Sequence, residues 1–149
     1  MRAVVQRVKR AEVRVDDRIV GAVSKGFLVY LGVEKGDSLS DLEYISTKLE
    51  NLRVFEDSNG KMNLDLKEAE GELLIVSQFT LAGDVRKGRR PSFDKAEAPE
   101  RAKELYEAII NNLRGKGFKV EKGEFQAHME VESINDGPVT LLLDSRKVF

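Results

Sequence analysis

The stretch that most restricts the fold of this chain is Phe27–Val33, in which almost every residue is apolar. A strand with one face in water alternates apolar and polar residues, whereas a strand buried on both faces is apolar nearly throughout. We therefore expect Phe27–Val33 to be an inner strand of a sheet. Each buried face of a sheet has to be covered by another layer, so the rest of the chain must supply these layers.

Further strands are predicted on both sides of this run. Glu12–Val15 alternates like a half-buried strand, and the turn residues Asp16 and Asp17 separate it from Ile19–Val23. The later segments with strand patterns are Arg53–Glu56, Glu72–Leu81, Lys119–Val120, Glu124–Ser133 and Val139–Leu143.

Two helices are expected to pack on the sheet. The first begins near Ser40, which can form a capping box with Glu43. The second begins near Pro99 and stops at Gly115 or Gly117, because proline suits the first turn of a helix and glycine often follows the last. Their inner faces are predicted to consist of Leu42, Ile45, Leu49 and Leu52, and of Ala102, Leu105, Ile109, Ile110 and Leu113. The pattern predicts an α/β fold with mixed β-sheets and two main helices on one side.

Composition excludes several classes of protein. With 149 residues, the chain is expected to be one domain (1–149) that buries a core without cross-links. It has no cysteine, which excludes disulfides, thiolate nucleophiles and cysteine-ligated zinc. No apolar stretch approaches the roughly 20 residues of a membrane span, and the charged N-terminus does not resemble a signal peptide. We expect a cytoplasmic enzyme or binding module. Because the net charge is only −1, any contact with RNA should be a local patch.

Two short polar segments next to buried strands are the best candidates for a functional site. Ser77–Leu81 ends one apolar run, and Asn135–Thr140 precedes another. At both places, small polar side chains and accessible backbone meet the end of a strand. The structural alternatives are a strand cap for the first segment and a hairpin turn for the second, since Asn-Asp-Gly between two strands is a common turn sequence.

The two segments, in this order and at these positions, resemble the D-aminoacyl-tRNA deacylase family, whose members hydrolyse the ester that joins a D-amino acid to tRNA. Three more segments are similar to the family, namely Met1–Val8, Gly26–Val33 and Asn51–Phe55. The resemblance implies a three-layer β/β/α fold and a homodimer with active sites at the subunit interface. It implies neither a cofactor nor a metal. The expected substrate is the acceptor end of D-aminoacyl-tRNA, and glycyl-tRNA is expected as a second substrate.

The same resemblance implies roles for individual residues. The expected catalytic residues are Ser77, Gln78, Phe79 and Thr80. Of these, Gln78, Phe79 and Thr80 are expected to position the substrate while the ribose hydroxyl of the terminal adenosine assists hydrolysis. Gly137 and Pro138 form a Gly-cis-Pro motif that enters the site of the partner subunit and rejects L-amino acids through backbone atoms alone. Arg7 and Met129 are expected in supporting positions.

Several alternatives stay open on the residues alone. The candidate tRNA contacts are Arg86, Lys87, Arg89 and Arg90, which form either a solvated loop or a set of phosphate contacts. The hydroxyl of Thr80 is a candidate nucleophile, but a threonine nucleophile needs a base to activate it, and no residue near Thr80 in the sequence supplies one. His128 is the only histidine, and on the alternating strand expected there a structural role is commoner than a catalytic one. The other functions considered are a non-catalytic RNA- or ligand-binding module and a small-molecule esterase.

Overall fold

Strand β1 (Arg2–Val15) joins all parts of the main sheet in the computed structural model, which describes residues 1–149. One edge of β1 pairs antiparallel with β8 (Glu130–Asp144) along most of its length. The other edge pairs first with β3 (Gly26–Gly32) and then with β2 (Arg18–Val23). A single long strand therefore holds three neighbours in place.

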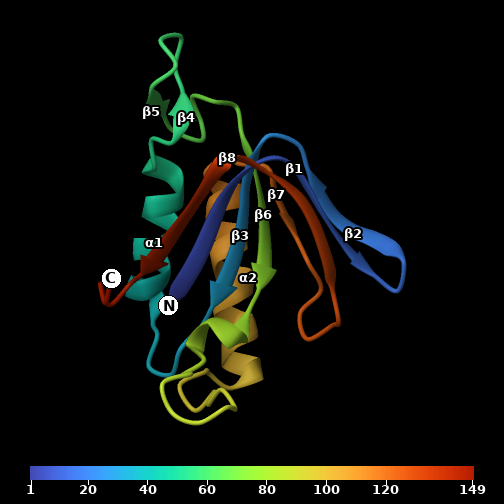
Figure 1. The fold of residues 1–149 in the computed structure, drawn as a ribbon, viewed down its shortest axis with the longest axis vertical. Helices are drawn as coiled ribbons and strands as arrows, with labels where there is room; N and C mark the ends of the chain where they lie inside the picture. The colour runs from blue at the N-terminus through green and yellow to red at the C-terminus, as the bar shows by residue number, and fades with distance from the viewer.

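The remaining elements continue outward from β3. Strand β6 (Glu72–Ser77) pairs in parallel with β3, and β7 (Val120–Lys122) pairs in parallel with β6. Helices α1 (Leu39–Asn51) and α2 (Pro99–Gly115) lie on the same side of this sheet (Figure 1). The short elements are the hairpin strands β4 (Phe55–Glu56) and β5 (Met62–Leu64) and the 3₁₀ helix η1 (Phe79–Ala82).

The side chains of β3 alternate between two hydrophobic cores, which explains why this strand is apolar throughout. Phe27, Val29 and Leu31 belong to the core that the helices share, whereas Leu28 belongs to a smaller core. The buried residues of the smaller core are Val8, Ala11, Val13, Val23, Leu28, Leu74 and Val76. Because all of these come from strands, the sheet folds over itself. The molecule consequently has the expected three layers, β/β/α.

The two β layers touch where β2 approaches β7. A Cβ atom on Gly21 would lie 2.3 Å from the carbonyl oxygen of Lys122, so this approach requires a glycine. The contact fixes the end of β7, from which one wall of the cavity described below continues.

The helices have the predicted positions, with one difference at a cap. The first helix begins at Leu39, and its capping pair is Ser38 with Asp41 instead of Ser40 with Glu43. The backbone N–H of Ser38 donates to the Asp41 carboxylate over 2.8 Å. Both pairs have an acidic residue three positions after a serine, and the earlier pair caps the helix. Neither helix combines the length and the apolar character needed to cross a membrane.

Three predicted strands are too long, and the shortest of them, Arg53–Glu56, is a strand only over Phe55–Glu56. β6 ends at Ser77 instead of Leu81, because the chain turns there into η1. Of the predicted strand Glu124–Ser133, only the part from Glu130 onward is a strand. Residues 124–129 form a connection with turns instead, and this difference creates much of the site.

Candidate active site

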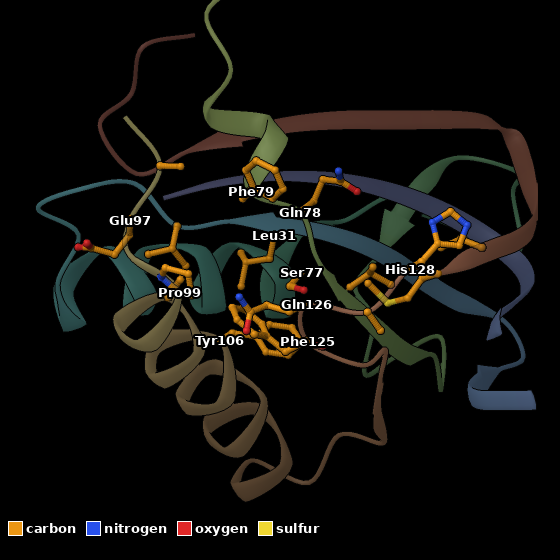
Figure 2. A pocket seen from close by; sticks show the side chains of 17 residues that line it. Leu31, Ser77, Gln78, Phe79, Glu97, Pro99, Tyr106, Phe125, Gln126 and His128 are labelled. Carbon is orange, nitrogen blue, oxygen red and sulfur yellow. The ribbon is translucent and has the colours of Figure 1, made fainter. Parts of the chain in front are cut away.

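A cavity of about 550 Å³ opens beside the end of β6. Strand β7 pairs only with Leu73–Ile75, so the last residues of β6 have no strand beside them on that edge. Residues 125–129, which follow β7, form one wall of the cavity at this place (Figure 2). The lining side chains are Leu31, Val33, Val76, Ser77, Gln78, Phe79, Ala96, Glu97, Pro99, Ala102, Tyr106, Phe125, Gln126, Ala127, His128, Met129 and Val131.

Tyr106 holds α2 against β6 within this cavity. Its hydroxyl donates a hydrogen bond to the carbonyl oxygen of Ile75 over 2.8 Å, and its ring centroid lies 5.8 Å from that of Phe125. Burial raises the pKa of Tyr106 far above its ordinary value, so the hydroxyl stays protonated and remains a donor. Figure 2 shows both rings below Ser77. The wall opposite the strands is therefore aromatic and fixed.

Three of the four predicted catalytic residues line the cavity, namely Ser77, Gln78 and Phe79. The backbone N–H of Gln78 donates to the Leu31 carbonyl over 2.8 Å, which ties this turn to β3. Thr80 is exposed beside the cavity, and its hydroxyl accepts a hydrogen bond from the side-chain amide of Gln78. Phe79 and Thr80 begin η1, and the first N–H groups of a helix have no acceptors within that helix.

Gly137 and Pro138 lie in a bulge of β8, not in a hairpin turn. Gln6 pairs with Thr140 and Val8 pairs with Asn135, so residues 136–139 lie opposite Arg7 alone. The two halves of β8 thus continue on the same edge of β1, which rules out the hairpin alternative. The Gly137–Pro138 peptide bond is cis, and both residues are exposed.

Arg7 fastens this bulge to the body of the protein. Its side chain is only 7% exposed; Nε donates to the main-chain oxygen of Asp136 over 3.1 Å, and Nη1 donates to the Val54 carbonyl over 2.6 Å. Gly137 has a φ of +127°, and a Cβ there would lie 3.0 Å from Arg7 Nη2. The backbone conformation therefore requires glycine at this position, and a larger residue would also press on the Arg7 side chain.

The bulge does not line the cavity of its own chain. Arg7 pairs with Phe27, which pairs with Leu73 at the start of β6, whereas Ser77 at the end of β6 pairs with Leu31. Typical strand dimensions place the bulge about 13 Å from Ser77 along the strands and about 14 Å from it across three strand spacings. The structure thus brings Ser77–Thr80 together with the cavity and keeps Gly137 and Pro138 away from it.

Met129 and His128 both line the cavity, although they were expected on a strand. A Cβ on Gly123 would lie 2.6 Å from the sulfur of Met129, so the Met129 side chain packs closely on the backbone of this connection. His128 is exposed and belongs to the cavity wall, not to a core. No group of three or more His, Asp or Glu side chains is placed to hold a metal ion.

The basic segment forms a loop closed at its base. Asp84 and Ser92 exchange backbone hydrogen bonds of 2.8 and 2.9 Å. Arg86 donates from Nε to the Asp84 carboxylate over 2.9 Å, and these side-chain hydrogen bonds hold the pKa of Asp84 well below its usual range. The other three candidate contacts, which are exposed and form no ion pair, are Lys87, Arg89 and Arg90. Arg86 is therefore already neutralised, and three free cations remain.

The wall of the cavity opposite the strands was not predicted from the sequence. Phe125 and Gln126 were assigned to a strand, and Tyr106 was not singled out at all. The available signal was Gly123, directly before the predicted strand, because glycine often marks a turn or loop.

Comparisons with known proteins agree with this architecture. The family model described as D-Tyr-tRNA(Tyr) deacylase matches residues 4–144. Proteins named D-aminoacyl-tRNA deacylase from Thermosipho africanus and Koribacter versatilis are 58% and 59% identical, with 100% of each chain covered. A solved structure titled "c-Myc DNA Unwinding Element Binding Protein" is 41% identical, with a TM-score of 0.91 and coverage of 97% of this chain and 98% of that one. A second, titled "Structural Analysis of a probable eukaryotic D-amino acid tRNA deacylase", is 18% identical with a TM-score of 0.78 over 95% and 97% of the two chains, and shows the shared fold.

Proposed function

Since the chain belongs to the D-Tyr-tRNA(Tyr) deacylase family, we propose that it hydrolyses the ester bond of D-aminoacyl-tRNA and releases the free D-amino acid and tRNA. The observation that carries this proposal is the cavity at the end of β6, which the polar residues Ser77 and Gln78 and the ring of Phe79 line. Its volume of about 550 Å³ lies within the range of pockets that bind small ligands. The terminal adenosine with its amino acid is a ligand of this class.

In the proposed mechanism, the terminal adenosine occupies the apolar part of the cavity and the ester carbonyl lies beside Gln78. Water adds to the carbonyl carbon, and the developing oxyanion is held by backbone N–H groups at Phe79 and Thr80. The ribose oxygen then leaves and takes up a proton. An aminoacyl ester is already activated, so positioning with help from the neighbouring ribose hydroxyl is sufficient. Thr80 positions the substrate and forms no covalent intermediate.

Selectivity for D-amino acids is proposed to come from Gly137 and Pro138. Their backbone atoms form a rigid wall that engages the amino group of the substrate and occupies the space required by an L side chain. A D side chain points away from this wall and makes few contacts with it. Glycine, which has no side chain, also fits. This explains how one site accepts many D-amino acids and still rejects every L-amino acid.

The wall is proposed to act in the partner subunit of a homodimer. Gly137 and Pro138 are exposed, and they lie far from the cavity of their own chain in the pairing register. A second copy can place them at a cavity mouth. The outer edge of β8 is also free of any strand partner, which leaves backbone groups available beside the bulge.

Deacylation of matched D- and L-tyrosyl-tRNA by the purified protein tests this function. We expect hydrolysis of the D-ester and almost none of the L-ester. Comparable rates would refute the backbone wall. Tight binding of tRNA without turnover would identify the non-catalytic binding module instead, and rapid cleavage of simple esters without RNA would identify a small-molecule esterase.

A further inference from the structure

Two phenylalanine rings are exposed next to the cavity. The side chains of Phe79 and Phe93 are 58% and 36% exposed, and their ring centroids lie 5.1 Å apart at an interplanar angle of 68°. Val85, which is 72% exposed, belongs to the same short stretch of the chain. Clustered exposed apolar groups on a folded protein commonly mark a binding surface.

The backbone of the loop holds the ring of Phe93 in place. Ser92 is paired with Asp84 at the base of the loop, and Ala96 N–H donates to the Phe93 carbonyl over 2.9 Å. A Cβ on Gly83 would lie 3.0 Å from Cε1 of Phe93, so the ring lies directly on the backbone of Gly83. The ring is therefore positioned before any ligand arrives.

The two rings form a path from the cavity to the free cations. Phe79 lines the cavity, and Phe93 packs on Phe79. Ser92, which precedes Phe93, pairs with Asp84 at the base of the basic loop. The tip of this loop carries Lys87, Arg89 and Arg90. Figure 1 shows this loop in yellow-green beyond the end of β6, beside the start of α2.

We infer that the Phe79–Phe93 pair stacks the unpaired base that precedes the terminal adenosine of the substrate, while the three free cations contact the phosphates of that strand. The inference rests on the proposed function and adds a second nucleotide site to it. Positive side chains beside exposed aromatic rings are the usual means of holding single-stranded nucleic acid. The three unpaired positive charges favour this occupant over an apolar protein partner.

The test uses D-tyrosyl esters of three short substrates. They are adenosine, the dinucleotide cytidylyl-adenosine, and the same dinucleotide with an abasic ribose in place of cytidine. A stacked base contributes about ten-fold or more to binding, so kcat/KM should be that much higher with cytidine than with the abasic ribose. The abasic substrate retains the phosphate, so this comparison isolates the base.

Variants at Phe93 decide whether the ring is responsible. Phe93→Leu should abolish the gain from the base, and Phe93→Tyr, which restores a flat ring, should keep it. The matched control is Phe149→Leu, because Phe149 is also exposed, at 62%, but is far along the chain. A wild-type protein with no gain from the base, or a Phe93→Leu variant that keeps it, would overturn the inference. If a second copy covers the rings instead, Phe93→Leu will change the dimer equilibrium and leave the gain intact, which also overturns it.

A binding measurement separates this inference from the proposed function. An uncharged RNA hairpin with an unpaired CCA end carries fluorescent pyrrolocytidine next to the terminal adenosine. Quenching by the wild type and by Phe93→Tyr, but not by Phe93→Leu, supports stacking even if no substrate is hydrolysed. Absence of quenching by the wild type overturns stacking, whatever the activity on D-tyrosyl-tRNA.

Discussion

The Nε atom of Arg7 lies 3.1 Å from the main-chain oxygen of Asp136 and donates a hydrogen bond to it. The same guanidinium group reaches the Val54 carbonyl, so one buried side chain connects β1, the bulge of β8 and the segment before β4. Within the bulge, the backbone N–H of Val139 donates to the side-chain oxygen of Asn135, and the side chain of Arg7 attaches the bulge to the rest of the protein.

Arg7→Lys should damage the enzyme while it preserves the charge. A lysine cannot donate to both carbonyls at the angles of the guanidinium fork. We expect the rate on D-tyrosyl-tRNA to fall by about 10- to 100-fold, since a displacement of about 1 Å can cost this much, and the preference for D over L to decrease. Arg10→Lys is the control, because Arg10 is exposed and pairs only with Glu132. An unchanged D-to-L ratio in Arg7→Lys would contradict the role of the bulge.

Thr80→Ala should retain substantial turnover. The hydroxyl of Thr80 accepts a hydrogen bond from the Gln78 amide, and an amide cannot remove its proton. A true nucleophile would lose on the order of 10³-fold or more in kcat on removal. Single-turnover kinetics and mass spectrometry of quenched reactions measure this. An acyl group trapped on Thr80 would show that the positioning mechanism is wrong.

Reversing Arg89 and Arg90 to Glu should weaken binding of tRNA and reduce its dependence on salt. Each lost phosphate contact on a single strand lowers the slope of log K against log salt by about 0.7, so the slope should change by about 1.4. Arg86→Gln should have a smaller effect, because Asp84 already neutralises Arg86. The matched control is a double reversal of Lys61 and Lys67 near the β4–β5 hairpin, at the other end of the molecule (Figure 1). An equal effect of the control would mean that the loop makes no specific contact.

Chelators should leave hydrolysis intact, and His128→Ala should keep most of the kcat. No cluster of three acidic or histidine side chains is placed for a metal ion, and His128 lies on the cavity wall without a paired nucleophile. Activity is measured before and after treatment with EDTA. Loss of activity that a divalent metal restores would reveal a site formed in another way.

Mixed dimers test whether Gly137 and Pro138 act in the partner subunit. One variant has both residues changed to Ala, a second has Thr80→Trp to block the cavity, and each homodimer should be inactive. A mixed dimer contains one site with an intact cavity and an intact bulge, so exchange of subunits should restore up to half of the activity per mixed dimer. If the bulge served its own chain, every site would carry one defect. Verified exchange without rescue would therefore place the motif in its own chain's site.

Sequence patterns predicted the elements whose residues are determined by burial. The apolar run of β3 reflects two cores, and α2 shows both its proline start and its apolar stripe, so both were located correctly. The cap of α1 was placed two residues late because Ser38 and Ser40 have acids at the same spacing. Local patterns of this kind do not distinguish neighbouring alternatives of equal chemistry.

The site was predictable only in part. The polar residues at Ser77–Thr80 were visible because they interrupt an apolar strand. The bulge of β8 could not be predicted, because it depends on which residues of β1 it faces. Those residues are more than 120 positions away in the sequence, so the local sequence does not indicate the pairing. The connection at 124–129 was mistaken for a strand for a similar reason, since its shape follows from where β7 ends.

The pairing of Arg2 with Asp144 also has a consequence during synthesis of the protein. The ribosome releases β1 early and β8 late, so β1 has an unpaired edge for most of translation. Contacts between such distant parts of a chain also form slowly compared with local ones. We therefore expect the nascent chain to depend on protection from aggregation until β8 emerges. The Gly137–Pro138 bulge takes shape only when β8 pairs with β1, so it forms together with this edge of the sheet.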